Sequence, residues 1–514
     1  MICLAYMIKK NSPWFKIILA LAVICLYFFT RLQHLDAIPV FGDEAIYIRW
    51  SQIIKNEETL RFIPQTDGKQ PLFMWLTSIS LRLITDPLIA GRLVSVVAGF
   101  FTMVGIFLTV SIYPSFFEQS FNPVNFIKNS LKRNFYLGWL SAIIYIFLPF
   151  SFFFDRLAVP DNLLSAFGIW SLFFSLLLAK FKRLDLSLIL GMILGLAWLT
   201  KSPAVYFIAL SFGTFIILNL DHLKLIYLPI ISAILAFLIY NILRLGPQFQ
   251  MIALRNRDYI WPLSEIIKHP LDPFKSHFGS ALTIFIQYLS WPILIFALIG
   301  LVLYFFYQKN THFLIVIAWV LLPLLANSAV ARVFTARYIL FILPPLVVLL
   351  TIGLSIWFSR YLSKTIFILL LLILNIIWIK RLSLNPFDFK LPSTETGYLQ
   401  NWTSGWGIKP ASDYLKTRSQ QANIIVGTEG SFGTLPDGLQ IYTDGTPQLT
   451  VIGQGLGFTQ IPSSLVDARK FGDEVYLLLN KSRLTLSSQD QDKLVLVQSY
   501  PKPDGDELLL YRLK

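Results

Sequence analysis

Two adjacent carboxylates, Asp43 and Glu44, occur in the stretch FGDEAIYIRW, immediately after the first long apolar run of the chain. Charged side chains at membrane depth are costly unless they are paired or line a wet cavity. A carboxylate held close to a hydroxyl group can take its proton, which is general base chemistry. Asp43 alone could equally cap a helix. Acid–base chemistry at this position therefore requires partner residues from other segments.

Basic residues recur further along the chain, each close to an end of an apolar run. They are found in DGKQPLF, FFDRLAVPDNLL, GLAWLTKSP and ARVFTARYILFILPP, as Lys69, Arg156, Lys201, Arg332 and Arg337. Each alone has an ordinary explanation, because boundary lysines and arginines reach toward lipid headgroups. Asp161, which follows a proline, could likewise be a helix cap. Taken together, these acids and bases are expected to converge on one cavity at the outer face of a membrane.

The composition is that of a polytopic membrane protein. Of the 514 residues, 55% are hydrophobic and only 14% are charged, which is too apolar for a soluble multidomain protein. The net charge of +14 is attributed to loops on the cytoplasmic side, and no nucleic-acid partner is expected. After residue 382 the chain becomes polar. We therefore predict a transmembrane domain at 1–382 and a soluble α/β domain at 383–514.

About eleven spanning helices are predicted, since a span needs about 20 mostly apolar residues. They are placed at residues 14–32, 88–113, 135–154, 162–179, 186–200, 203–220, 225–243, 281–307, 313–330, 338–358 and 365–380. Lysines and arginines are concentrated in the short loops of one side, which the positive-inside rule assigns to the cytoplasm. The chain is thus expected in the plasma (inner) membrane as a multi-pass protein, with a cytoplasmic N-terminus and an exoplasmic C-terminal domain.

Two amphipathic surface helices are predicted in the first outer loop. At residues 71–85, apolar side chains form one stripe, but the segment is too short to span a membrane. Residues 43–56 show a similar pattern, with Asp43 and Glu44 in the first turn. Both segments therefore fit helices that lie on the outer membrane surface.

These motifs, in this order, resemble one family. FGDEAIYIRW, DGKQPLFMWL, FDRLAVPDNLLSAF, GLAWLTKSP and ARYILFILPPL are similar to the corresponding parts of GT-C membrane glycosyltransferases of the protein O-mannosyltransferase and lipid A aminoarabinose transferase type. The resemblance covers residues 1 to about 380. One departure is that Gln70 separates Lys69 from Pro71, where the family often has Lys directly before Pro, and this weakens a specific role for Lys69.

The resemblance implies a glycosyltransferase that takes a sugar from a polyprenyl-phosphate carrier and passes it to a hydroxyl acceptor, usually with inversion. Asp43 would then be the general base, with Glu44 positioning the base or the acceptor. The phosphate of the donor would be bound by Lys201 and Arg337, with Lys69 and Arg156 as helpers. The acceptor, whether a cell-envelope lipid, a polysaccharide or a protein, and the sugar are not determined.

Further residues are predicted to contact substrate. The long outer loop at 244–280 contains RNRDYIWP, whose mixture of aromatic and charged residues is typical of a sugar-binding surface. We expect this loop to be a mobile cover, with Arg257 and Tyr259, together with Asp161 and Arg332, in contact with substrate. No cofactor is assigned. A divalent metal held by carboxylates and a histidine, His269 or His277, is an open alternative, because no tight ligand spacing demands it.

Three other functions compete with transfer. A flippase or transporter of lipid-linked sugars would show internal repeats and broken spans in matching halves, and no such repeat is visible in the sequence. A polysaccharide ligase would use the same phosphate-binding bases, so the sequence separates it poorly. A sensor anchored by its spans is disfavoured by the convergent charges.

Overall fold

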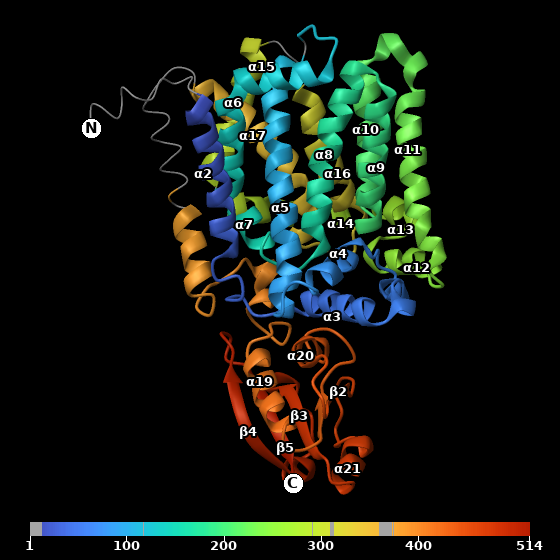
Figure 1. The fold of residues 1–514 in the computed structure, drawn as a ribbon, viewed down its shortest axis with the longest axis vertical. Coiled ribbons are helices and arrows are strands. Elements are labelled where there is room, and N and C mark those ends of the chain that lie inside the picture. The colour runs from blue at the N-terminus through green and yellow to red at the C-terminus, as the bar shows by residue number, and fades with distance from the viewer. Residues whose placement is uncertain (1–12, 117, 290, 309–312, 359–372, 374) are drawn as a thin grey trace, which may run out of the picture.

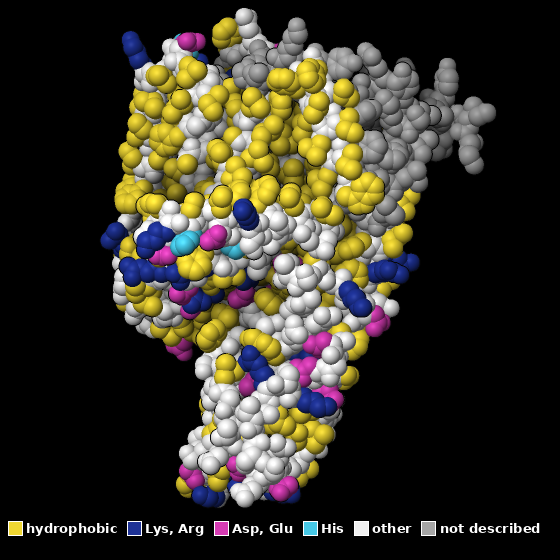
Figure 2. All heavy atoms as spheres, turned by 180° about the vertical axis from the view of Figure 1, so that it is seen from behind, with side chains coloured by type: hydrophobic (Ala, Val, Ile, Leu, Met, Phe, Trp, Pro, Cys, Tyr) yellow, Lys and Arg dark blue, Asp and Glu magenta, His cyan; other side chains and the backbone are white. Residues whose placement is uncertain are grey.

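The computed structural model consists of an upright helical bundle with a smaller domain beneath it (Figure 1). It describes residues 13–116, 118–289, 291–308, 313–358, 373 and 375–514. Hydrophobic side chains cover the upper part of the bundle, and charged side chains gather below them, toward the smaller domain (Figure 2). This distribution is that of a membrane-embedded body with one polar end.

The long helices of the bundle run parallel and antiparallel to one another. They are α2 (Pro13–Leu32), α5 (Pro87–Ile112), α6 (Pro123–Phe147), α8 (Pro160–Phe181), α9 (Leu184–Thr200), α10 (Ala204–Leu218), α11 (Tyr227–Tyr240), α14 (Asp272–Leu289), α15 (Trp291–Gln308), α16 (Phe313–Val330) and α17 (Leu343–Phe358). Within the described residues, six helical segments are long and apolar enough to cross a membrane, and α9 and α10 are shorter apolar helices. The predicted helical membrane domain is confirmed, and the number of eleven spans stays a prediction.

Prolines set the start of several helices. Helices α5, α6 and α8 each have a proline in the first turn, where its missing N–H would be unpaired in any case. Asp86 caps α5, because its side chain accepts hydrogen bonds from the amides of Leu88 and Ile89. This cap fixes the point at which the chain enters the bundle after the first outer loop.

One predicted span is interrupted, and two others include residues outside the described ranges. The predicted span at 135–154 is interrupted: α6 ends at Phe147 and the short helix α7 (Pro149–Phe154) follows, since Pro149 cannot continue a helix and restricts Leu148. The predicted span at 281–307 coincides with parts of α14 and α15, and residue 290 between them lies outside the described residues. The predicted span at 365–380 lies largely outside the described residues.

Helices α3 (Gly42–Asn56) and α4 (Leu72–Ser80) lie across the lower end of the bundle (Figure 1). Both were predicted as surface helices, and α4 ends five residues earlier than predicted. Helix α3 is more buried than a helix on a lipid surface would be, because it lies between the bundle and the C-terminal domain. It carries Asp43 in its first turn, so the two domains together hold this carboxylate in place.

The C-terminal domain is α/β, as predicted. Its five-stranded sheet has the order β2-β1-β3-β5-β4, formed by β1 (Ile424–Thr428), β2 (Leu449–Gly453), β3 (Glu474–Asn480), β4 (Leu494–Pro501) and β5 (Glu507–Leu513). Strand β1 pairs in parallel with β2 and β3, whereas β5 is antiparallel to both β3 and β4. Its helices include α19 (Ile408–Ser419), α20 (Asp437–Thr443) and α21 (Ser463–Lys470).

The C-terminal domain contacts α3 through polar groups as well as apolar ones. The side-chain amide of Gln52 donates to the carbonyl oxygen of Ile441 at 2.8 Å. The Arg49 guanidinium forms an ion pair with Asp444 at 2.7 Å. These contacts fix α20 against α3. The predicted boundary between 382 and 383 stays a prediction.

Candidate active site

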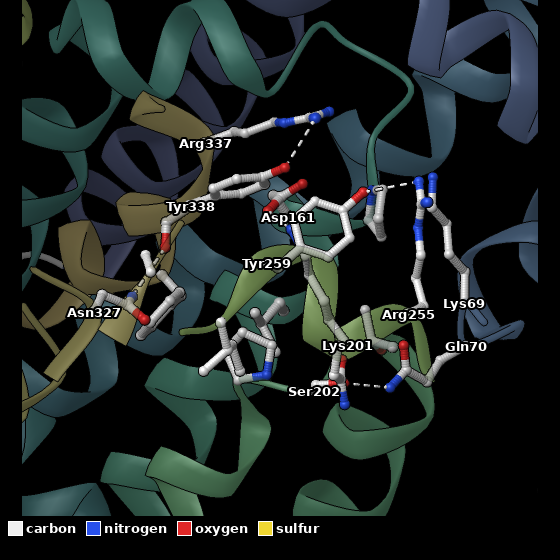
Figure 3. A pocket seen from close by; sticks show the side chains of 18 of the residues that line it. Lys69, Gln70, Asp161, Lys201, Ser202, Arg255, Tyr259, Asn327, Arg337 and Tyr338 are labelled. Atoms are coloured by element: carbon white, nitrogen blue, oxygen red, sulfur yellow. Dashed lines mark hydrogen bonds and ion pairs between the residues drawn. The ribbon is translucent and has the colours of Figure 1, made fainter. Parts of the chain in front are cut away.

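A cavity of about 400 Å³ opens where the lower ends of the membrane helices meet the first outer loop (Figure 3). Its walls come from the segment before α4, the start of α8, the turn after α9, helix α12 (Gln250–Tyr259), the end of α16, and the 3-10 helix η6 (Ala336–Ile342). The predicted site residues among its lining are Lys69, Asp161, Lys201, Tyr259 and Arg337. The convergence of residues from separate loops thus occurs at one place.

Asp161 and Lys201 form the first acid–base pair of the cavity. Asp161 stands in the first turn of α8, and Lys201 ends α9 in an extended conformation. The Lys201 Nζ atom lies 2.6 Å from the Asp161 Oδ1 atom, and it also lies 4.5 Å from the ring centroid of Tyr338. Burial lowers the pKa of Lys201, although the charge of Asp161 opposes this shift. A partly desolvated ammonium with aromatic and carboxylate neighbours can bind one phosphate oxygen.

Asp43 and Arg337 form the second pair, in which Arg337 lines the cavity and Asp43 does not. The guanidinium of Arg337, on η6, forms an ion pair with the carboxylate of Asp43, whose side chain is 21% exposed. Burial alone would raise the pKa of Asp43, but the charges of Arg337 and Lys69 outweigh it and the pKa is lowered. Asp43 is therefore ionised at neutral pH, which is the state that a general base requires.

Lys69 is held by aromatic rings and by an acid. Its Nζ atom lies 5.0 Å from the ring centroid of Tyr47 and 5.5 Å from that of Trp50. It also lies 3.5 Å from Asp67, whose carboxylate is 3.7 Å from Arg255. Arg255 on α12, the first residue of RNRDYIWP, also lines the cavity. No role was predicted for it. Helix α12 therefore forms a wall of the cavity, in the loop that was predicted to be a cover.

An uncharged hydrogen-bonded chain crosses the same wall. The Gln70 side-chain nitrogen donates to the Ser202 hydroxyl at 2.8 Å, and this hydroxyl donates to the Asn256 side-chain oxygen at 3.2 Å. Figure 3 shows Gln70 and Ser202 joined across the cavity wall. The chain links the first outer loop, the turn after α9 and α12. In the sequence, Gln70 stands out only as a departure from a motif, and no role was predicted for Ser202 or Asn256.

Glu44 lies away from the cavity, in contrast to the predicted role at the acceptor. Its side chain is fully buried and forms a bidentate ion pair with Arg92 of α5, at 2.9 and 2.8 Å. Its oxygens also accept hydrogen bonds from the amides of Phe41 and Ala158, at 3.1 and 2.7 Å. Glu44 therefore joins α3, α5 and the segment before α8, and this geometry assigns it a structural role.

Three other predicted residues also lie outside the lining. Arg156 is buried and donates to the Ser383 hydroxyl at 2.9 Å and to the carbonyl oxygens of Gln33 and His34. Arg332 lies over the Trp261 ring, 4.6 Å from its centroid. Arg257 is exposed on α12. Arg156 therefore binds the segment that follows α2. Its side chain would have to leave these carbonyl oxygens to make the predicted contact with a phosphate.

A metal site receives no support from the described residues, among which no group of three or more His, Cys, Asp and Glu side chains could hold an ion. The His269 Nδ1 atom lies 3.3 Å from the carboxylate of Asp272. His277 stacks on Phe334, with ring centroids 5.0 Å apart. The residues proposed as alternative ligands are thus dispersed.

The linker to the C-terminal domain also reaches this region. The 3-10 helix η7 (Ser393–Tyr398) contains Glu395, whose Oε1 atom accepts a hydrogen bond from the amide of Ala336 at 2.9 Å. Tyr398 packs against Phe41, with the two rings tilted and their centroids 4.2 Å apart. Glu395 therefore contacts the residue directly before Arg337, and Tyr398 contacts a residue two positions before Asp43. The sequence carried no signal for them, because a carboxylate in a polar linker is ordinarily solvated.

The structure is that of an integral membrane protein, with an apolar helical bundle, two surface helices between α2 and α5, and a C-terminal α/β domain. Its fold is shared, over nearly the whole chain, with solved structures of the lipid A aminoarabinose transferase ArnT. The structure is similar to that of ArnT from Cupriavidus metallidurans bound to undecaprenyl phosphate, with a TM-score of 0.57, 13% identity, and 97% of this chain and 98% of that chain covered.

Two further structures are similar to differing degrees. The apo state of the same ArnT gives a TM-score of 0.59 and 12% identity over 98% of both chains. The S. cerevisiae protein O-mannosyltransferase Pmt1-Pmt2 complex bound to the sugar donor gives a TM-score of 0.32 and 16% identity, over 46% of this chain and 34% of that chain. No protein-family model and no curated protein sequence matches the chain.

Proposed function

We propose that the protein transfers a sugar from a polyprenyl-phosphate donor to a hydroxyl acceptor on the outer face of the plasma membrane. The observation that carries this proposal is the position of two acid–base pairs, Asp161–Lys201 and Asp43–Arg337, at a cavity that also has apolar walls at the membrane end. A donor with a charged phosphate and a hydrocarbon chain needs both features. The similarity in fold to a protein bound to undecaprenyl phosphate supports the same donor class.

The apolar walls account for the lipid part of the donor. Val205 on α10 and Val333 after α16 line the cavity and are 48% and 43% exposed. These positions give a hydrocarbon chain a path from the cavity toward the surface of the bundle. The phosphate then lies between Lys201 and Arg337, where two positive charges compensate the negative charge of the leaving group.

The transfer step follows from the two pairs. The acceptor oxygen attacks the anomeric carbon as its proton passes to the Asp43 carboxylate. The bond between the anomeric carbon and the phosphate oxygen breaks on the opposite face, and its electron pair stays on the phosphate. Lys201 and Arg337 stabilise the charge that develops there. Attack from the face opposite the leaving group inverts the configuration of the sugar.

Arg337 would connect donor binding with activation of the base. Without donor, its guanidinium is occupied by the Asp43 carboxylate. A phosphate between Lys201 and Arg337 competes for the same N–H groups, which leaves Asp43 more available to accept a proton. The arrangement is consistent with an enzyme that activates the acceptor only when the donor is present.

Transfer from a radiolabelled polyprenyl-phosphate sugar by the purified protein in lipid nanodiscs tests the proposal. Asp43→Asn and Lys201→Ala are each expected to reduce transfer by about 10²-fold or more in protein that still unfolds cooperatively on heating. Asp221→Asn, on the exposed 3-10 helix η4 (Leu220–Leu225), is the matched control and should retain full activity. Full activity in both site variants would contradict the assigned residues, and movement of the carrier across the bilayer without transfer would support a flippase instead.

A further inference from the structure

We propose that the donor sugar is neutral and rich in hydroxyl groups, and that Gln70, Ser202 and Asn256 form the subsite that binds these hydroxyls. This inference rests on the proposed transferase function and specifies its substrate class. It excludes sugars that carry a free amine, because the cavity holds a surplus of positively charged lining residues and its nearby carboxylates are already paired.

The Gln70–Ser202–Asn256 chain has unused hydrogen-bonding capacity. In the orientation that makes both internal bonds, the Gln70 carbonyl oxygen and the Asn256 amide nitrogen have no partner among the described residues. One is an acceptor and the other a donor. Two neighbouring hydroxyl groups of a sugar ring need such a combination, since each hydroxyl both donates and accepts.

Asp161 offers a further acceptor at the opposite wall. Its side chain is 2% exposed, and its Oδ1 atom is bonded to Lys201. The Oδ2 atom is buried and has no hydrogen-bond partner in the part of the chain that the structure describes. A buried carboxylate oxygen without a donor is unfavourable, and a sugar hydroxyl in the cavity would satisfy it while the ion pair with Lys201 remains.

The charges of the cavity argue against an ammonium group. Four bases and one carboxylate line it: Lys69, Lys201, Arg255, Arg337 and Asp161. Each carboxylate at the cavity is already bonded to a base, since Asp161 pairs with Lys201, Asp43 with Arg337, and Asp67 with both Lys69 and Arg255. An added ammonium would approach these bases, while the negative charge of each of these carboxylates is already compensated by a base.

The arrangement also argues against a sugar acid. Lys201 and Arg337 are the bases that a single donor phosphate would occupy. Lys69 and Arg255 share the carboxylate of Asp67, at 3.5 and 3.7 Å, and Arg255 also contacts Asp258 at 3.1 Å. The subsite between these two groups of charges is formed by amides and a hydroxyl. Its chemistry is therefore complementary to neutral hydroxyl groups.

Two measurements on the full-length protein test this inference. The first compares transfer from polyprenyl-phosphate-linked hexose, 2-amino-2-deoxyhexose and hexuronic acid. The second measures binding of the corresponding phosphonate analogues, in which the sugar cannot be transferred. At pH 7 the hexose is expected to exceed both charged sugars at least tenfold in kcat/KM and in affinity. As pH rises through the pKa of the sugar amine itself, the amino sugar should approach the hexose.

The variant Gln70→Glu provides the decisive control, because it adds a carboxylate without changing the size of the side chain. It should reduce the preference for the hexose over the amino sugar at least fivefold, whereas Gln250→Glu, an exposed change on the same helix as Asn256, should not. Equal or better use of a charged sugar by the wild type, or an unchanged preference in Gln70→Glu, would overturn the inference. Preferential binding of the hexose analogue without any transfer would leave this subsite standing and refute the transferase instead.

Discussion

At the scale of single residues, the ionisation of Asp43 depends on Arg337. The guanidinium, with the ammonium of Lys69, outweighs the effect of burial and holds the pKa of Asp43 below its ordinary value. The base is therefore already ionised at neutral pH. Loss of Arg337 removes the largest opposing charge and leaves burial, which raises the pKa.

We predict that Arg337→Gln moves the acidic limb of the profile of kcat/KM against pH to higher pH. In the wild type this limb belongs to a carboxylate with a lowered pKa, so activity should stay constant down to about pH 5. In the variant, activity should fall as pH decreases through the raised pKa, in addition to a loss of donor affinity at all pH values. Arg332→Gln, which removes a guanidinium that lies over Trp261, is the matched control. An unshifted limb in Arg337→Gln would contradict the coupling.

Glu44 differs from Asp43, because its carboxylate is fully buried and paired with Arg92. Glu44→Gln leaves the Arg92 guanidinium buried and only partly bonded, and breaking such a pair typically costs about 3–5 kcal/mol. We therefore expect a marked decrease in melting temperature and in yield. Asp43→Asn, at a partly exposed position, should change stability much less. Equal stability of the two variants would contradict the structural role of Glu44.

This contrast shows what the sequence could and could not predict at residue scale. That Asp43 and Glu44 belong to a conspicuous pair was visible, but not which of them faces the cavity. Adjacent residues of a helix point about 100° apart, and only the tertiary structure decides their partners. A signal existed in Arg92, which stands in an otherwise apolar helix and requires a buried anion. The same reasoning applies to Arg31 and Asp155, which form a buried ion pair at 3.2 Å.

At the scale of elements, η7 of the linker determines how η6 begins. Glu395 accepts the amide hydrogen of Ala336, one residue before Arg337. Burial raises the pKa of Glu395 to about 7, although the amide of Ala336 and the charge of Arg337 oppose the shift. The folded protein thus binds a proton at Glu395 more strongly than the unfolded chain does. This preference stabilises the fold at acidic pH and is lost as pH rises from about 4.5 to about 7.

We predict that Glu395→Gln removes this pH dependence. A neutral amide keeps an oxygen for the Ala336 amide, so the variant should fold. The wild type should lose up to about 3 kcal/mol of stability between pH 4.5 and pH 7 through this residue, and Glu395→Gln should lose correspondingly less. Thermal unfolding in detergent across this range, with the exposed variant Glu265→Gln as control, measures the difference. Parallel curves for wild type and Glu395→Gln would refute the assignment.

Element boundaries were predicted where local chemistry decides them. The span predicted at 88–113 agrees within one residue with α5 (Pro87–Ile112), which Asp86 caps. By contrast, the interruption of the predicted span at 135–154 between α6 and α7 could not be read from hydropathy, because the chain is apolar on both sides of it. Pro149 was the available signal. The convergence of the charged residues could be predicted from the order and sidedness of the spans alone. The Gln70–Ser202–Asn256 chain could not, because it depends on how three separate segments are placed in space.

At the scale of the whole molecule, the C-terminal domain supports the helix that carries the base. It contacts α3 through the Arg49–Asp444 ion pair and through the Gln52 side chain, and Asp444 also accepts a hydrogen bond from Asn56. On the other side of the interface, Lys409 forms an ion pair with Asp86, which caps α5, at 2.8 Å. The domain is therefore expected to keep Asp43 in register with Arg337.

We predict that Asp444→Arg loosens α3 without unfolding the protein. It places two guanidinium groups next to each other at an interface where the native side chains are 23% and 27% exposed, so the cost should be about 1 kcal/mol. Amide hydrogen exchange in residues 42–56 should become faster, and kcat/KM should fall by about fivefold or less. The double variant Arg49→Asp/Asp444→Arg reverses the charges and should restore both. Unchanged exchange in α3 would mean that the bundle alone positions this helix, because the contacts of Asp444 with Arg49 and Asn56 both join the two domains.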